Sequence, residues 1–265
     1  MIDLHSHILP GLDDGAADLK EALTMAGIAV ADGIKTMVAT PHVETGLYDN
    51  SRETILAAVD ELRGHLQENN IPLELLPGAE YHLEPDLPGR LQRGELLTIN
   101  DGGRYLLVEL PAALVPEYTA RVFYELQLQG VTPIIAHPER NLALTNHPSI
   151  FYELVARGAV AQLTAASFTG GSRRAAAAAR AFLAKGCVHL VATDAHNSNK
   201  RPPHLAEAGQ QVAKLAGQAR SVELVSGNPL RVLQGRVLET GKIEYPRQSR
   251  RSLLQRLKRL VSRRS

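Results

Sequence analysis

The sequence lacks the features of secreted and membrane-spanning proteins. It contains one cysteine, Cys187, and no tryptophan among 265 residues, so no intramolecular disulfide can form. No uncharged apolar run reaches the roughly 18 residues that a bilayer-spanning helix needs. The N-terminus shows no signal segment, because Asp3, His5 and His7 interrupt its first apolar residues. Together these absences predict a cytoplasmic protein.

Acidic residues are missing from the C-terminal end of the chain. Residues 247–265 hold eight basic residues and no acidic one, which leaves 21 Lys and Arg against 28 Asp and Glu in residues 1–246. The net charge of +1 therefore combines an acidic body with a basic tail. We predict one domain over residues 1–245 and a separate tail over residues 246–265.

The tail has a helical pattern of apolar residues. One face would carry Leu253, Leu254, Leu257, Leu260 and Val261, with arginine and lysine around it. Such a segment suits an anionic membrane surface, here the inner membrane face, or an acidic protein partner, and a solvated terminus is the alternative. No aromatic residue is interleaved with the basic ones, so nucleic acid is not the expected partner.

The body alternates apolar runs with helical patterns. The runs are nearly continuous in apolar character, as in strands that are buried on both faces, and they cover 2–8, 35–40, 74–80, 105–110, 132–138, 160–164 and 189–194. Helical patterns cover 18–33, 51–68, 117–129, 148–157, 173–185 and 204–216. No Gly-x-Gly-x-x-Gly or Walker sequence follows the first run, which weakens a nucleotide-binding interpretation. The alternation predicts an α/β fold with a parallel sheet, either a barrel or an open doubly wound sheet.

Histidine and carboxylate side chains gather at the ends of the predicted strands. His5 and His7 hold alternate positions of the first strand and therefore share one of its faces. Six of the seven predicted strands carry such residues at or just beyond their C-terminal ends: His5, His7, His42, Glu80, Glu109, His137, Asp194 and His196. In a parallel barrel those ends meet on one face, where active sites are built. Each residue alone has an ordinary structural explanation, but the joint pattern predicts one shared site.

The types of these residues point to a metal centre. Imidazole and carboxylate without thiolate suit Mn²⁺, Fe²⁺ or Zn²⁺ and give no reason to expect an iron–sulfur cluster or a zinc finger. Five histidines and several carboxylates exceed the needs of one tetrahedral ion, so we predict two or three ions. Such centres activate water near neutral pH and polarise phosphoryl oxygens, which makes hydrolysis the leading chemistry.

Two arginines lie in the loops beside these predicted ligands. Arg140 follows His137 by three residues, and Arg201 follows His196 by five. A guanidinium group suits bidentate contact with phosphate, although either arginine alone is as readily explained by a surface ion pair. Their joint position favours a phosphate ester as substrate.

Several stretches, in this order along the chain, resemble a known family. They are HSHILPGLDDG, ATPH, PGAEYH, RYLLVEL, VTPIIAHPERN and ATDAHNSNKRPPHL. They are similar to the polymerase and histidinol phosphatase (PHP) superfamily, and within it to the metal-dependent protein-tyrosine phosphatases of bacterial capsule and exopolysaccharide operons. The resemblance runs from Met1 to about Gln234. It implies a distorted TIM-like (β/α)7 barrel with the metal site at the C-terminal ends of the strands.

The resemblance also implies roles for individual residues. A first metal would be held by His5, His7, Glu80 and Asp194, with Glu80 bridging to a second metal that also takes Glu109 and His137. A third would take Asp14, His42 and His196. Arg140 and Arg201 would hold the phosphate, and Asp194 would act with them in catalysis. The metal would be manganese first, with iron or zinc as alternatives.

The same resemblance implies hydrolysis of phosphotyrosine on a membrane-bound tyrosine autokinase that controls polysaccharide synthesis and export. Two other interpretations stay open from the residues. One is a related phosphoesterase acting on histidinol phosphate or nucleotides, and the other is a non-catalytic regulator. Cysteine-based phosphatase chemistry is excluded, because it needs Cys-x5-Arg and Thr193 stands six residues after Cys187. Cys187 is expected to be a small core residue.

Overall fold

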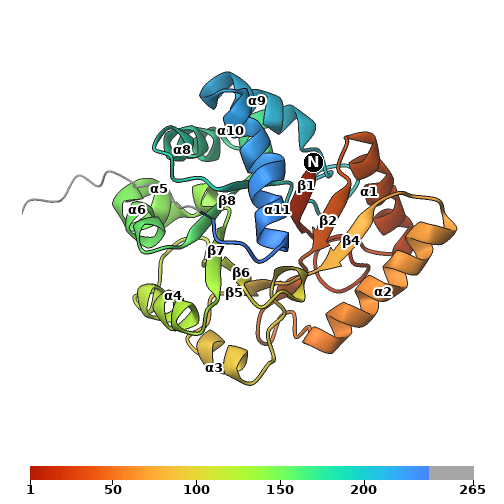
Figure 1. Ribbon diagram of the computed structural model, residues 1–265, viewed down its shortest axis with the longest axis horizontal. Helices are drawn as coiled ribbons and strands as arrows, with labels where there is room; N and C mark the ends of the chain where they lie inside the picture. Colours follow the sequence, from red (N-terminus) through yellow and green to blue (C-terminus); the bar gives the residue numbers. More distant parts are fainter. Residues whose placement is uncertain (239–265) are drawn as a thin grey trace, which may run out of the picture.

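The computed structural model describes residues 1–238, in which parallel strands form a ring enclosed by helices (Figure 1). The strands are β1 (Ile2–Ser6), β2 (Thr36–Ala39), β3 (His42–Val43), β4 (Glu74–Pro77), β5 (Glu80–His82), β6 (Tyr105–Glu109), β7 (Thr132–Ala136), β8 (Val160–Thr164) and β9 (Leu190–Ala192). Seven of them lie in the seven predicted runs, whereas β3 follows the run 35–40 and β5 begins at the last residue of the run 74–80. The predicted tail, and with it its proposed membrane contact, falls outside the described residues.

The strands pair in parallel from one position of the ring to the next. One ladder has the order β1-β2-β4 and the other has the order β3-β5-β6-β7-β8-β9. Because β3 continues β2 and β5 continues β4 after short breaks, the nine described strands fill seven positions. The Asp194 N–H donates to the His5 carbonyl (2.9 Å) and the His7 N–H to the Ala195 carbonyl (2.8 Å), so the last position joins the first. The fold is the predicted parallel α/β barrel, distorted at these breaks.

One of the two breaks depends on a glycine. A Cβ atom at Gly78 would lie 2.8 Å from Cγ1 of Val38 on the neighbouring strand, closer than side chains approach one another. The glycine lets the chain step sideways there, and Glu80 begins a new strand whose N–H donates to the Pro41 carbonyl (3.0 Å). The predicted strand 74–80 is therefore two strands, and the step directs Glu80 toward the end of the ring.

Six helices occupy the predicted helical ranges: α1 (Leu19–Ala31), α2 (Arg52–Glu68), α4 (Thr119–Leu128), α6 (Pro148–Ala156), α8 (Arg173–Ala184) and α9 (Ala206–Ala216). Five shorter helices and three other helical turns were not predicted: α3 (Leu87–Gln92), α5 (Leu142–Asn146), α7 (Ala166–Thr169), α10 (Gln218–Val222), α11 (Asn228–Leu233), η1 (Ile99–Asp101), η2 (Pro138–Arg140) and the π-helical η3 (Glu223–Gly227). Within residues 1–238, no helix combines the length and apolar character that crossing a membrane requires.

The first helix is fixed at its start in a way that also serves the site. The Asp18 side chain caps α1 by accepting from the Glu21 N–H (2.8 Å). The Glu21 carboxylate does not return the bond to Asp18. It accepts instead from the Ser198 N–H (2.7 Å), two residues beyond His196. This bond ties the loop that carries His196 and Arg201 to α1.

The two faces of the strands have separate apolar cores. On β6, Leu106 and Val108 pack in the larger cluster with helix residues such as Leu126 of α4. Tyr105 and Leu107 alternate with them and pack in the smaller cluster, which is made mainly of strand residues. In Figure 1, α11 crosses the ring, and Val232 of α11 belongs to the smaller cluster. The smaller cluster therefore fills the inside of the ring below the polar end.

A buried histidine outside the site makes stability depend on pH. The ring of His189 accepts the Ala161 N–H at Nδ1 (3.0 Å), while its Nε2 has no hydrogen-bond partner. Burial, helped by Arg220, lowers the pKa of His189 from 6.5 to about 4. Between pH 6.5 and pH 4, His189 therefore binds a proton in the unfolded chain but not in the folded chain. As pH falls through that range, this difference lowers the free energy of unfolding.

We expect His189→Gln to remove this contribution, which reaches about 3 kcal/mol once the pH lies below the pKa of His189 in the folded chain. Urea unfolding at pH 7.5 and pH 4.5 would show a smaller loss of stability in the variant than in the wild type. Asp3 acts in the opposite direction, because burial raises its pKa to about 6, but it is present in both proteins and cancels in the difference. An identical pH dependence of the two proteins would contradict the expectation.

Candidate metal centre

The C-terminal end of the ring gathers the predicted ligand residues. They come from the ends of β1, β6, β7 and β9, from the starts of β3 and β5, and from the loop before α1: His5, His7, Asp14, His42, Glu80, Glu109, His137, Asp194 and His196. Their ligand atoms form overlapping groups in which all atoms lie within 4.8 Å of one another. Every residue that the sequence proposes as a metal ligand is therefore in the same cluster.

The groups can be compared with the predicted division among three ions. They are His5, His7 and Glu80; His5, His137 and Asp194; His42, Glu80 and Glu109; and His7, Asp14, His42 and His196. Glu80 belongs to two of the groups, and His137 falls with His5 and Asp194 rather than with Glu109, so the division among three ions stays a prediction. His42 differs, because its Nδ1 lies 3.1 Å from Glu80 Oε2 while its Nε2 lies 3.6 Å from Asp14 Oδ1. It thus stands between two of the groups rather than in one.

At the centre of the cluster, imidazole nitrogens and carboxylate oxygens lie close to one another. The Nε2 atoms of His5 and His7 lie 3.1 Å apart, as expected for side chains on one face of β1. Glu80 Oε2 lies 3.1 Å from Nε2 of His5 and 3.4 Å from Nε2 of His7. Asp194 Oδ1 lies 3.4 Å from each of these two nitrogens. All four side chains are buried.

The hydrogen bonds behind the histidines determine which ring nitrogen carries a lone pair. His5 Nδ1 meets the Gln162 side-chain oxygen (2.8 Å), and His7 Nδ1 meets Asp13 Oδ2 (2.7 Å). Because both partners are acceptors, Nδ1 is the donor in each ring, and Nε2 is the atom that faces the carboxylates and would bind a cation.

Glu80 Oε2 forms no hydrogen bond despite its imidazole neighbours. This buried carboxylate oxygen, with the imidazole nitrogens around it, is a ligand atom whose bonding a cation would complete. The residues present therefore fit divalent metal ions.

Burial and neighbouring charges set the ionisation of the cluster. Burial acts to raise the pKa of Glu80, but the imidazoles, with His5 and His137 foremost, hold it well below its usual value. The pKa of Asp194 is likewise held well below its usual value against burial, with His5 as the main cause. Burial acts to lower the pKa of His7, yet the carboxylates bonded to its ring raise it well above its usual value. The site holds two buried anions, which is the charge that a divalent cation requires.

Asp194 lies between the metal cluster and the two arginines. Its Oδ1 faces His5 and His7, while its Oδ2 accepts from Arg140 Nη1 and from Arg201 Nη2, the latter at 2.5 Å. The arginine side chains are 43% and 35% exposed, so their outer faces stay open to a ligand. Both arginines therefore reach the cluster. Each forms its ion pair there with Asp194, which is itself predicted to bind metal.

Two of the site residues have an unusual backbone. His137 and Asp194 have φ values of +29° and +54°, in the left-handed region that residues with a Cβ atom rarely adopt. His137 directly follows β7, and Asp194 lies two residues after β9. The left-handed backbone conformation lets each side chain turn back over the end of the ring. Such strain commonly marks functional sites, where packing of the surroundings maintains it.

Asp13 is a site residue that the sequence reasoning missed. Only its neighbour Asp14 is predicted as a ligand from the sequence. Asp13 Oδ2 receives His7 Nδ1 (2.7 Å) and the His42 N–H (2.8 Å), and its Oδ1 accepts the Gly15 N–H (2.9 Å). It therefore orients two of the histidines, while the half-exposed Asp14 reaches His196 Nε2 at 3.3 Å.

Gln162 is the second missed residue. It lies in β8 with its side chain 1% exposed, and its amide nitrogen donates to the Leu163 carbonyl (2.8 Å). This bond turns the amide oxygen toward His5. A polar residue inside the apolar run VAQLT was the available indication, because a buried amide needs partners.

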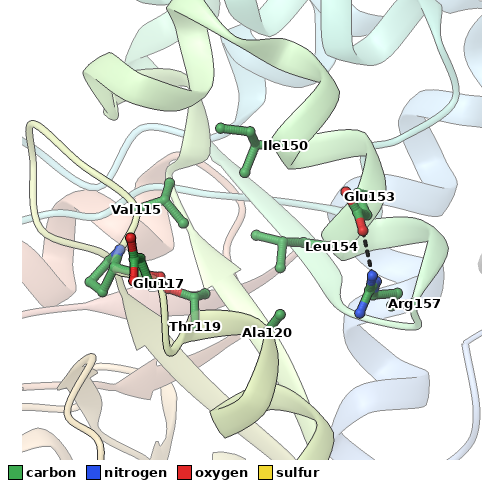
Figure 2. Close-up of a pocket in the computed structure, with 9 residues that line it drawn as sticks. Val115, Glu117, Thr119, Ala120, Ile150, Glu153, Leu154 and Arg157 are labelled. Carbon is green, nitrogen blue, oxygen red and sulfur yellow. Dashed lines mark hydrogen bonds and ion pairs between the residues drawn. The ribbon is translucent and has the colours of Figure 1, made fainter. Parts of the chain in front are cut away.

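A further cavity lies away from this cluster. Figure 2 shows the groove between α4 and α6, about 220 Å³ in volume, with Val115, Ile150 and Leu154 around it. Its charged lining residues include Glu153 and Arg157, which form an ion pair with each other. None of the clustered ligand residues lines it, so it is not part of the metal centre.

Comparison with known proteins finds matches over most of the chain. Residues 1–234 match the family described as "Capsular polysaccharide synthesis, CpsB/CapC". The tyrosine-protein phosphatase YwqE of Bacillus subtilis is 43% identical over 210 residues, covering 78% of this chain and 82% of YwqE. The tyrosine-protein phosphatase CpsB of Streptococcus pneumoniae is 30% identical over 244 residues, covering 90% of this chain and all of CpsB.

A solved structure is similar over nearly the same length. It is described as one of the crystal structures of YwqE from Bacillus subtilis and CpsB from Streptococcus pneumoniae, "unique metal-dependent tyrosine phosphatases". It is 39% identical, covers 90% of this chain and 96% of its own, and superposes with a TM-score of 0.86.

Proposed function

The chain belongs to the CpsB/CapC family of capsular polysaccharide synthesis, and from this premise we propose that it is a metal-dependent protein-tyrosine phosphatase. Its relatives are named tyrosine-protein phosphatases, and the similar solved structure is described as metal-dependent. The observation that carries the proposal is the convergence of nine imidazole and carboxylate ligands beside two arginines at one end of the barrel. This arrangement favours a phosphatase over a non-catalytic regulator.

We propose that the cluster holds two or three divalent ions, manganese first, with iron or zinc as alternatives. His5, His7, Glu80 and Asp194 would hold the central ion, and the outer residues described above would hold the others. When bound, such ions lower the pKa of water and polarise the phosphoryl oxygens. The protein residues keep the ligand atoms in place through Asp13 and Gln162, and the buried position of Glu80 excludes bulk water.

Arg140 and Arg201 would orient the phosphate for attack. Both guanidinium groups are anchored on Asp194 Oδ2, so their remaining N–H groups point at a fixed place beside the cluster. Positive charge held there stabilises the negative charge that spreads over the phosphoryl oxygens in the transition state. The phenolate of tyrosine, with a pKa near 10, leaves more readily than an alkoxide, so a strong general acid is dispensable.

Substrate selectivity tests the proposed function. The metal-loaded protein should hydrolyse a phosphotyrosyl peptide with a kcat/KM at least about a hundredfold above that for histidinol phosphate or a nucleotide monophosphate. Release of inorganic phosphate from equal concentrations of the three substrates would measure this. Preference for either small substrate would replace the proposal with the related phosphoesterase activity. No release from any of them in metal-loaded protein would favour a regulator.

Arg201→Ala should weaken substrate binding more than it slows the chemical step. Losing one charge-assisted contact to phosphate corresponds to about a tenfold to hundredfold rise in KM. Steady-state kinetics on the phosphotyrosyl peptide would show the rise with kcat within about tenfold of wild type. Arg121→Ala is the matched control, because Arg121 pairs with Glu125 on the outer face of α4. Unchanged kinetics of Arg201→Ala would remove Arg201 from the phosphate site.

Cys187→Ser should leave kcat/KM within about twofold of wild type. Cys187 is fully buried, and burial raises the pKa of its thiol to about 11, so it supplies no thiolate at neutral pH. The expected role as a small core residue agrees with this position in the apolar cluster. A loss of activity beyond tenfold in a correctly folded variant would reopen cysteine chemistry.

We also propose a cytoplasmic tyrosine autokinase, bound to the membrane, as the protein substrate. The support is the capsule-synthesis family together with the phosphotyrosine chemistry of the site. Association of the basic tail with the inner membrane face belongs to the same proposal and rests on sequence alone. Equal partitioning of full-length and tail-deleted protein onto anionic vesicles would remove the membrane contact.

A further inference from the structure

A cavity of about 480 Å³ opens directly beside the two arginines. It is lined on one side by Arg140, Asp194 and Arg201, which also border the metal cluster. From there it extends over α7 and the start of α8, and over Pro202 of the next loop. A volume of this size lies in the range of small-ligand sites. The cavity is thus continuous with the place where the phosphate would be held.

The floor of the cavity is built from small apolar residues. Ala165, Ala166 and Ala175 line it, and Pro202 stands at its edge. Ala175 is buried, whereas the side chain of Ala166, at the first position of α7, is exposed to the cavity. The rest of the lining is largely polar and includes Thr169, Ser172, Lys200 and His204, so the alanines form one apolar side of the cavity. That side suits the face of a ring.

The turn between α7 and α8 holds this floor in place. The Gly171 N–H donates to the Ala166 carbonyl (2.6 Å), and a Cβ atom at Gly171 would lie 2.8 Å from that oxygen. Glycine is therefore needed for the turn to close. Ser172 then caps α8 by accepting the Ala175 N–H (3.2 Å). The surface presented by α7 and α8 is a built feature of the fold.

A buried carboxyl group connects α7, which lines the cavity, to the turn that carries Arg140. Glu139 precedes Arg140 in η2, and its Oε1 accepts from the Thr164 N–H and from the Ser167 hydroxyl, both at 2.8 Å. Its side chain has no exposure to solvent. Because neighbouring residues of one turn reach the phosphate site and α7, the distance between the arginine and the floor is fixed.

We propose that this cavity binds the aromatic ring of the substrate's phosphotyrosine, with Ala166 as a specificity-determining residue. The inference rests on the proposed function, because it takes the phosphate to lie on Arg140 and Arg201. A tyrosyl side chain then extends from the phosphate across the alanine floor. The side chains of phosphoserine and phosphothreonine carry no ring to cover that floor, so the cavity would select aryl over alkyl phosphates.

Two nonhydrolysable ligands, phenylphosphonate and methylphosphonate, would measure the ring contact without turnover. Titration calorimetry on the metal-loaded full chain should give about tenfold tighter binding of phenylphosphonate, the gain expected from covering one face of a ring. Ala166→Leu places a larger side chain where the ring would lie and should reduce this preference to about twofold or less, while methylphosphonate binds as in wild type. Ala166→Ser, which adds little volume, should keep the preference.

Ala177→Leu is the matched control, because Ala177 lies on the exposed side of α8 and does not line the cavity. It should keep the tenfold preference. The proposal is overturned if wild type binds both ligands equally or if Ala166→Leu keeps the preference for phenylphosphonate. It is also overturned if Ala166→Leu weakens the binding of methylphosphonate as much as that of phenylphosphonate. Hydrolysis of phosphotyrosyl peptide by wild type is measured alongside. Equal binding with intact hydrolysis rejects the ring site alone, whereas absent hydrolysis rejects the proposed function.

Discussion

Replacing His5 with alanine should lower kcat/KM for a phosphotyrosyl peptide at least about a thousandfold. His5 approaches His7, Glu80 and Asp194 at once, with nitrogen–oxygen distances of 3.1 and 3.4 Å to the two carboxylates. Loss of residues behind metal ligands commonly costs tenfold to a hundredfold in affinity or activity, so the loss of a central ligand should cost more. Kinetics at saturating manganese, with metal content measured on the same sample, would test this.

The matched control for this variant is His65→Ala. His65 lies in α2 and bonds Glu68 (3.0 Å) on the protein surface, so its removal should leave kcat/KM within about twofold of wild type. His5→Ala should bind fewer metal ions per chain than this control. Activity within tenfold of wild type in His5→Ala, at full metal content, would show that the central ion is held by other residues.

The strands and long helices could be predicted because their signals are local. The run YLLVEL is apolar on both faces, and it is β6 in the structure. The predicted helical range 51–68 begins at Ser51, which caps α2 by accepting the Thr54 N–H (3.1 Å). α11 could not be predicted in the same way. It has six residues, and Val232 and Leu233 gain their apolar contacts from the inside of the ring, which the local pattern does not encode.

The joining of the ring also depends on contacts between distant residues. Asp3 is fully buried, and its carboxylate accepts the Thr193 N–H (2.9 Å) and the Thr193 hydroxyl (2.5 Å). These bonds connect β1 to the segment just before Asp194, 190 residues later in the chain. In the sequence, Asp3 is only one acidic residue within an apolar strand. Its structural role exists once the two ends of the barrel are together.

The positions of the ligands were predictable, but their supports were not. Parallel strands bring their C-terminal ends to one face, so the alternation of strands and helices was enough to gather His137 and Glu109. Which acid supports which histidine depends on distances of a few ångströms. Asp13 and Asp14 are neighbours in the sequence, yet one receives His7 Nδ1 and the other approaches His196. A one-residue difference in the turn exchanges such roles.

Removing the metal ions should abolish activity and lower the melting temperature, and both should return on addition of Mn²⁺. Ions bound among the imidazoles of His5 and His7 and the buried carboxylates of Glu80 and Asp194 would hold these four side chains together. Ligands bound only by the folded state stabilise it by about 2.7 kcal/mol at a hundredfold excess over Kd. For a chain of this size that corresponds to roughly 5–10 °C. Differential scanning fluorimetry before and after chelation would measure the shift.

The direction of the pH dependence follows from the histidines. In the ion-free protein, the carboxylates bonded to the ring raise the pKa of His7 well above its usual value even though burial opposes this, and Glu80 raises the pKa of His137 in the same way. These rings must lose their protons before they can act as ligands, so metal affinity should weaken as pH falls and binding should release protons. Calorimetric titration of Mn²⁺ in two buffers of different ionisation enthalpy would count them. His5→Ala should show little change in melting temperature on chelation. An equal shift in that variant and in wild type would mean that the stabilising ions bind elsewhere.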